Sequence, residues 1–209
     1  MKQGSRGLLV LKTLLHLGFM LPPLWLVWGV MTERLGGDPV QYLIHFTGKG
    51  ALHGLMFTLL VSPLAKWLKL GALMQCRRLL GLWAFAYAVI HLALFLSLDL
   101  LFAWGLLLAE VIKRPYLVVG MISLLILLAL ALTSPNGVRR RLGRSWQTLH
   151  NLVYVAAILV PVHYLWSVKS EVIEPGIYLV LCIGLLWLRK DKLMRMLARY
   201  LPQRGELDT

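Results

Sequence analysis

The chain has 209 residues, of which 59% are hydrophobic and 15% are charged, and its formal net charge at pH 7 is +13. This composition and a mean hydropathy of +0.74 exclude a soluble globular domain and indicate an integral membrane protein. Membrane topology and anionic lipid account for the basic excess, so the charge does not predict a nucleic-acid partner.

Six segments are apolar enough for transmembrane helices, which need roughly 17 to 25 residues. In chain order they are residues 8–31, 45–68, 79–100, 116–132, 149–168 and 177–188, the last being short. The apolar stretch 101–111 is too short to span, and we interpret it as an interfacial segment or part of a loop. Turn signals at 36–39, 134–137 and 174–176 mark short connections. We therefore predict one domain over residues 1–209, an all-α membrane protein built as a six-transmembrane-helix bundle.

The basic residues predict the orientation of this bundle. With the N-terminus inside, 17 of the 22 Lys and Arg residues fall on cytoplasmic segments, and the other five are Arg34, Lys49, Lys113, Arg114 and Lys169. By the positive-inside rule, both termini should face the cytoplasm.

Histidine is the polar residue type that stands out in the predicted spans. All six histidines lie in or at the edge of a span: His16, His45, His53, His91, His150 and His163. One such histidine alone is as well explained by an interhelical hydrogen bond. Six, with almost no carboxylates in the spans, favour axial ligation of haem iron over a proton or cation pathway. The alternative is a transporter or assembly factor with structural histidines. The absorbance spectrum of the reduced protein distinguishes this alternative from a haem protein.

The positions of the histidines along their spans predict which of them meet. His91 lies about 18 Å into the third span, in its outer half, and His150 and His163 are about 20 Å apart along the fifth. His91 and His163 can therefore lie at the same depth, with His150 nearer the cytoplasm. On one ideal helix His150 and His163 would point about 140° apart, unless Pro161 rewinds the helix.

The sequence supports the other histidines less strongly as haem ligands. His16, in the inner half of the first span, could pair with His150 in a second haem site, and His45 lies at the outer edge of the second span. We interpret His53 as a packing residue. The stripe Gly81, Ala84, Ala88 and His91 is typical of close helix packing, and it would equally make a groove for a porphyrin edge.

Four segments carry a resemblance to a known family. HFTGKGAL (45–52), RRLLGLWAFAYAVIHL (77–92), KRPYLVVGMISLLILLALALTS (113–134) and LGRSWQTLHNLVYVAAILVPVHYLWSVK (142–169) resemble the MsrQ family, within the wider ferric-reductase-like transmembrane group. The resemblance implies a bacterial inner-membrane subunit that binds haem b, and also FMN. It would take electrons from the quinone pool or a cytosolic flavin reductase. It would pass them to the periplasmic molybdenum-containing subunit MsrP, which reduces methionine sulfoxide in oxidised proteins.

The resemblance also implies roles for particular residues. His91, His150 and His163 correspond to haem-ligand positions, whereas Arg77 and Arg78 stand where the wider group commonly has a histidine. We therefore favour one haem between His91 and His163, with a second at His150 as the alternative. The FMN phosphate could bind the basic clusters at 77–78 and 139–144, although topology explains those clusters too. Without a nucleophile, a carboxylate pair or a Gly-rich nucleotide loop, we expect a non-catalytic electron-transfer subunit that does not bind NAD(P)H.

Overall fold

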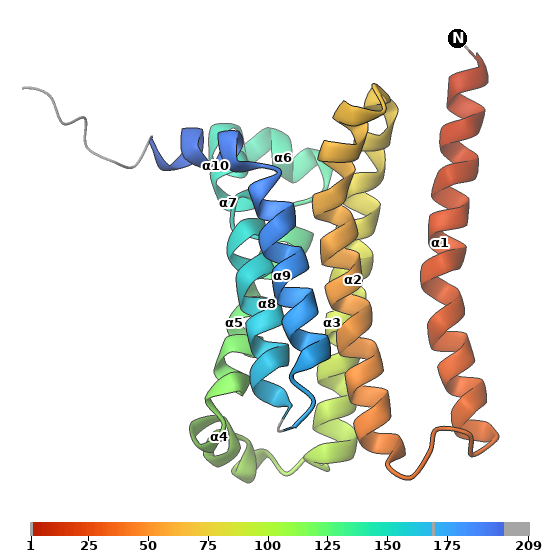
Figure 1. Cartoon of the computed structure of the whole chain (residues 1–209), viewed down its shortest axis with the longest axis vertical. Coiled ribbons are helices and arrows are strands. Elements are labelled where there is room, and N and C mark those ends of the chain that lie inside the picture. The colour runs from red at the N-terminus through yellow and green to blue at the C-terminus, as the bar shows by residue number, and fades with distance from the viewer. Residues whose placement is uncertain (1, 169, 199–209) are drawn as a thin grey trace, which may run out of the picture.

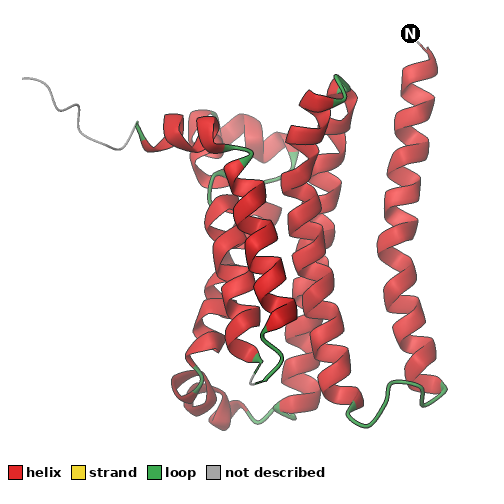
Figure 2. Ribbon diagram, viewed as in Figure 1, coloured by secondary structure: helices red, strands yellow, loops and turns green. Residues whose placement is uncertain are grey.

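The computed structural model describes residues 2–168 and 170–198, and every regular element in these ranges is helical (Figure 2). The long helices are α1 (Lys2–Met31), α2 (Pro39–Trp67), α3 (Arg77–Leu94), α5 (Pro115–Leu132), α8 (Val153–Ser167) and α9 (Ile173–Trp187). The short elements are η1 (Gly71–Cys76), the π-helix η2 (Phe95–Asp99), α4 (Trp104–Lys113), α6 (Asn136–Leu142), α7 (Arg144–His150) and α10 (Lys190–Leu197).

Each of the six predicted spans falls on a long helix, and the all-α membrane fold is confirmed. Four helical stretches in the described residues are long and apolar enough to cross a membrane: Arg6–Met31, Gly71–Asp99, Pro115–Leu132 and Arg144–Ser167. Helix α9 is apolar but has 15 residues, and α2 has 29 residues but carries His45, Lys49 and His53 within its length. The number of six spans therefore stays a prediction.

Helices α2, α3, α5, α8 and α9 form one bundle, and α1 lies along its side (Figure 1). The Tyr87 hydroxyl of α3 donates a hydrogen bond to the Phe19 carbonyl of α1 at 2.8 Å. The Phe19 ring stacks on Trp83 with 5.8 Å between ring centroids. These aromatic contacts attach α1 to α3.

The two ends of the bundle differ in their short elements. At one end lie α6, α7, α10 and the start of α1 (Figure 1). Helix α4 lies across the opposite end and covers most of the predicted interfacial segment 101–111. Leu101 and Phe102 both have positive φ, so the chain turns sharply before α4 begins.

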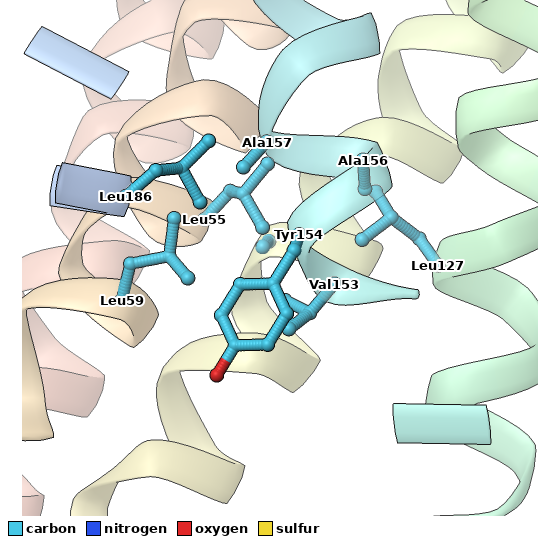
Figure 3. Packing of buried hydrophobic residues seen from close by; sticks show 9 residues of the cluster. Leu55, Leu59, Leu127, Val153, Tyr154, Ala156, Ala157 and Leu186 are labelled. Atoms are coloured by element: carbon cyan, nitrogen blue, oxygen red, sulfur yellow. The ribbon is translucent and has the colours of Figure 1, made fainter. Parts of the chain in front are cut away.

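Small residues bring the helices of the core together. Ala84, Ala156 and Ala157 are fully buried and pack with leucines from α2, α5 and α9 (Figure 3). A Cβ at Gly54 of α2 would stand 2.9 Å from the Ala84 Cα, so a side chain at residue 54 would force α2 and α3 apart. The small-residue stripe of α3 thus packs closely at Ala84, whereas Ala88 and His91 line a cavity.

The fifth predicted span agrees with the helical stretch Arg144–Ser167. Within this stretch a turn at Asn151 and Leu152 separates α7 from α8, so His150 and His163 do not share one regular helix. One local prediction was wrong. The predicted turn at 174–176 is the first turn of α9, where Pro175 is buried. Proline is tolerated there because the first backbone N–H groups of a helix have no intrahelical acceptor.

Candidate functional site

The imidazoles of His91 and His163 lie side by side between α3 and α8. Their ring centroids are 6.2 Å apart and their planes make an angle of 82°. Each histidine lies in the last turns of its helix, near the end of the bundle where α4 lies. Two segments 72 residues apart in the sequence thus place one imidazole each at the same depth.

Both rings are oriented by the same kind of hydrogen bond. His91 Nδ1 lies 2.9 Å from the Ile44 carbonyl oxygen of α2, and His163 Nδ1 lies 2.7 Å from the Tyr116 carbonyl oxygen of α5. A carbonyl oxygen only accepts, so Nδ1 of each ring must carry the proton. In the neutral imidazole, Nε2 then keeps its lone pair, which is the form that ligates a metal.

A glycine stands one helical turn after each accepting carbonyl. A Cβ at Gly48, four residues after Ile44, would stand 3.1 Å from His91 Nδ1. A Cβ at Gly120, four residues after Tyr116, would stand 2.7 Å from the His163 ring. Because residues four apart share one helix face, each glycine leaves the space in which an imidazole reaches the carbonyl.

Sequence reasoning missed this carbonyl and glycine arrangement. The signal in the sequence is a glycine four residues after the accepting residue, in IHFTG (44–48) for His91 and in YLVVG (116–120) for His163. The spacing indicates a histidine acceptor only when it is known that α2 packs against α3 and α5 packs against α8.

His91 and His163 line a cavity of about 430 Å³ at this end of the bundle. Its walls come from α2, α3, α5 and α8 and include Ala88 and Leu127, and Asp99 and Arg114 also line it. The volume falls in the range of small-molecule and cofactor sites, roughly 300 to 1,000 Å³.

The histidine pair fits axial ligation of a haem iron. Metal–imidazole bonds are about 2 Å long, so two imidazoles on opposite sides of one metal have ring centres about 6 Å apart. The separation of 6.2 Å between the two centroids agrees with that requirement. The described residues contain no group of three or more His, Cys, Asp or Glu side chains that could hold a metal ion. The donor set here is a pair of neutral nitrogens, which suits haem iron.

His45 also lies at this cavity, beside the pair. It lines the wall contributed by α2, and its ring packs edge-on against Tyr164 with 6.1 Å between centroids. The structure thus brings together three of the five predicted ligand candidates, His45, His91 and His163.

His150 lies away from the cavity, at the end of the bundle where α6 and α7 lie. Its ring stacks on Trp146 with 3.9 Å between centroids, and its Nε2 is 3.1 Å from the Thr133 hydroxyl. The Arg139 guanidinium lies over the same Trp146 ring at 4.7 Å. His150 is therefore held between α5, α6 and α7, close to the basic cluster 139–144.

His16 and His53 have different neighbours. His16 Nδ1 accepts a hydrogen bond from Trp83 Nε1 at 3.1 Å, which places it on the side of α3 that faces α1. His53 Nε2 lies 2.8 Å from the Tyr178 hydroxyl of α9. These contacts do not join His16 to His150.

Comparison with known proteins places this bundle in a class. Residues 47–161 match the family described as "Ferric reductase like transmembrane component". The matched range includes His91 and His150 and ends just before His163. A helical bundle with a facing histidine pair and this match define a ferric-reductase-like membrane protein.

Relatives identify the family more narrowly. The chain is 50% identical over 193 residues to each of three proteins named "Protein-methionine-sulfoxide reductase heme-binding subunit MsrQ", from Salmonella paratyphi B, Salmonella heidelberg and Salmonella schwarzengrund. The aligned region covers 92% of this chain and 97% of each relative. The chain belongs to the MsrQ family.

Proposed function

We propose that this protein is a haem b-binding electron-transfer subunit of a methionine sulfoxide reductase system, in which His91 and His163 would hold the haem iron. The observation that carries the proposal is the facing imidazole pair, 6.2 Å between centroids, with each Nδ1 on a backbone carbonyl. The names of the relatives, which describe a haem-binding subunit, support it. When bound, the haem supplies one-electron chemistry, because its iron alternates between the ferric and ferrous states.

The chain's own residues hold and orient the ligands. The carbonyls of Ile44 and Tyr116 fix the tautomer of each imidazole and raise the basicity of the opposite nitrogen. Gly48 and Gly120 leave room for the rings. The apolar part of the cavity wall, which includes Ala88 and Leu127, would tune the redox potential of the bound group.

We further propose the direction of electron flow. The donor is the quinone pool or a cytosolic flavin reductase, and the acceptor is the periplasmic molybdenum-containing subunit MsrP. The site lies at the end of the bundle opposite the basic elements α6, α7 and α10. The positive-inside rule favours these elements as the cytoplasmic side of a bacterial inner-membrane protein, which supports this direction. A soluble periplasmic partner can therefore approach the cavity near Asp99 and Arg114.

His150 and FMN remain separate proposals. His150 is the candidate for a second haem at the cytoplasmic side, where it would have to release Thr133 to free its Nε2. The FMN phosphate would bind the neighbouring cations, of which Arg139 already contacts Trp146. The runner-up function, a transporter or assembly factor without haem, predicts that the purified protein is colourless.

Haem content of purified variants tests the ligand assignment. We expect His91→Ala and His163→Ala to remove most of the b-type absorbance, and His53→Ala to keep it. The pyridine haemochrome assay measures haem per protein, and size-exclusion chromatography checks that each variant is folded. Full haem content in both ligand variants would exclude this site.

A further inference from the structure

A second cavity lies on the other side of α2 from the histidine pair. It is a groove of about 740 Å³ between α1 and the helices α2, α3 and α9. Towards the cytoplasmic end its lining is apolar, with Leu14 of α1 and Phe57, Leu60 and Leu64 of α2. Gly18 of α1 is exposed and lines the groove, so the groove is open sideways to the lipid.

Polar groups enter this groove from α2 and α9. Lys49 and His53 are four residues apart on α2, and Glu174 and Tyr178 are four residues apart on α9, so each pair shares one helix face. Two contacts join the pairs: Lys49 Nζ to Glu174 Oε1 at 3.1 Å, and His53 Nε2 to the Tyr178 hydroxyl at 2.8 Å. Lys49, His53 and Tyr178 line the groove, whereas Glu174 is exposed at the outer end.

The groove and the histidine cavity adjoin each other along α2 and α3. Lys49 of α2 lines both cavities. Its two neighbours pack against successive turns of α3, because Gly48 lies against His91, which lines the histidine cavity, and Gly50 lies against Tyr87, which lines the groove. The two cavities therefore come close together at the level of Lys49.

The shape and chemistry of the groove fit an amphiphile with a hydrogen-bonding ring and an apolar chain. From His53 to Leu64, α2 rises by about 16 Å, which gives the chain an apolar wall several isoprene units long. The His53–Tyr178 pair offers a hydrogen-bond acceptor and a donor at the level of the ring, whichever of the two atoms carries the shared proton. A phospholipid acyl chain would fill the apolar part and would leave this pair unused.

We propose that this groove is the quinol oxidation site of the protein, with the quinol ring at His53 and Tyr178 and the isoprenoid chain along α1 and α2. The inference rests on the proposed function, because it needs the His91–His163 haem as the electron acceptor. Oxidation of one quinol to quinone releases two electrons and two protons. The two electrons would pass one at a time to a haem held by His91 and His163, and the periplasmic acceptor would take up the first electron before the second is transferred. The protons pass to the His53–Tyr178 pair and leave past Glu174 at the outer surface.

Two variants test the site from different directions. Gly18→Phe adds a ring to the groove, and a Cβ at Gly18 meets nothing within 4 Å, so the backbone need not move. His53→Gln keeps a polar side chain and removes the group that accepts the proton. Gly184→Phe is the matched control, because Gly184 lies in the exposed part of α9, has equal space and does not line the groove.

Each variant is purified as the full haem-loaded chain, and three quantities are measured. Haem content and complete reduction by dithionite report on the haem site. Co-purifying quinone is quantified by extraction and chromatography. The rate of haem reduction by decyl-ubiquinol is followed by stopped flow at the α band.

We expect Gly18→Phe to lose the co-purifying quinone and to weaken the apparent affinity for decyl-ubiquinol by about tenfold or more, because burial of the chain drives binding. His53→Gln should slow reduction by roughly 10²-fold, the lower end of what a positioned proton acceptor contributes. Haem content, dithionite reduction and the Gly184→Phe control should match the unmodified protein. Unchanged quinol kinetics and quinone content in both variants would show a groove filled by lipid acyl chains only. Absence of haem from the purified unmodified protein would instead contradict the proposed function itself.

Discussion

Gly120 of α5 lies against the His163 ring of α8 so closely that a Cβ at residue 120 would stand 2.7 Å from Cε1 and 2.8 Å from Nδ1. The same relationship holds more loosely between Gly48 and His91, where the corresponding distances are 3.2 and 3.1 Å. The two glycines thus fix how near each imidazole comes to its carbonyl acceptor. A single added methyl group should therefore disturb the two ligands to different degrees.

We expect Gly120→Ala to lose more haem than Gly48→Ala. A contact below 3 Å forces His163 to move, whereas His91 can yield by a few tenths of an ångström. The measurement is haem per protein after purification, with Gly184→Ala as the control because that position has open space around it. Equal haem content in all three variants would mean that the glycines do not position the ligands.

Proline 161 offers a test of how α8 positions His163. Pro161 is buried two residues before His163 and removes one hydrogen bond from the helix. Pro161→Ala lets that bond form, straightens the last turns of α8 and displaces the imidazole. We expect haem to be retained and its reoxidation by the periplasmic partner to slow. Pro63→Ala in α2, also inside a helix, is the control, and a similar slowing in it would make the effect non-specific.

Arg189 is a buried residue that ties the start of α10 to the bundle. Its guanidinium donates to the Leu59 carbonyl of α2 and, at 3.4 Å, to the Tyr154 hydroxyl of α8. Arg189→Ala leaves a buried carbonyl without its donor, which costs about 1–3 kcal/mol of stability. Thermal unfolding in detergent should show the loss. The neighbouring Lys190→Ala, which removes a cation–π contact with Trp187, should cost less, about 0.5–1 kcal/mol.

Topology can be tested without purification. A periplasm-active reporter fused after Glu174 should be active, because the distribution of basic residues predicts that the start of α9 lies outside. A fusion after Asp208, which lies outside the described residues, should be inactive. The reverse pattern would exchange the donor and acceptor sides of the protein.

Sequence reasoning found the histidine pair because depth along a helix follows from a fixed rise per residue. It did not find the acceptors on Ile44 and Tyr116, since these depend on which helices pair in space. His53 was interpreted as a packing residue for the same reason, because its partner Tyr178 is 125 residues away. No periodicity in the sequence connects two such positions.

The span boundaries show a related limit. Hydropathy averages over a window, so it joined α7 and α8 into one span across the turn at Asn151 and Leu152. Hydropathy also predicts α2 as a transmembrane span like the neighbouring helices. His45, Lys49 and His53 of α2 are half-buried in the folded bundle and line its two cavities.

The most direct test of the electron-transfer role is the rate at which the reduced haem is reoxidised. In membranes, the haem is reduced through the quinone pool and its reoxidation is followed by stopped flow, with and without the periplasmic sulfoxide reductase and its oxidised substrate. We expect reoxidation to be faster when both are present, and most of the b-type haem signal to be missing in His91→Ala and His163→Ala. Equal reoxidation rates with and without the partner would contradict the role as an electron conduit and would leave only a haem-binding membrane protein.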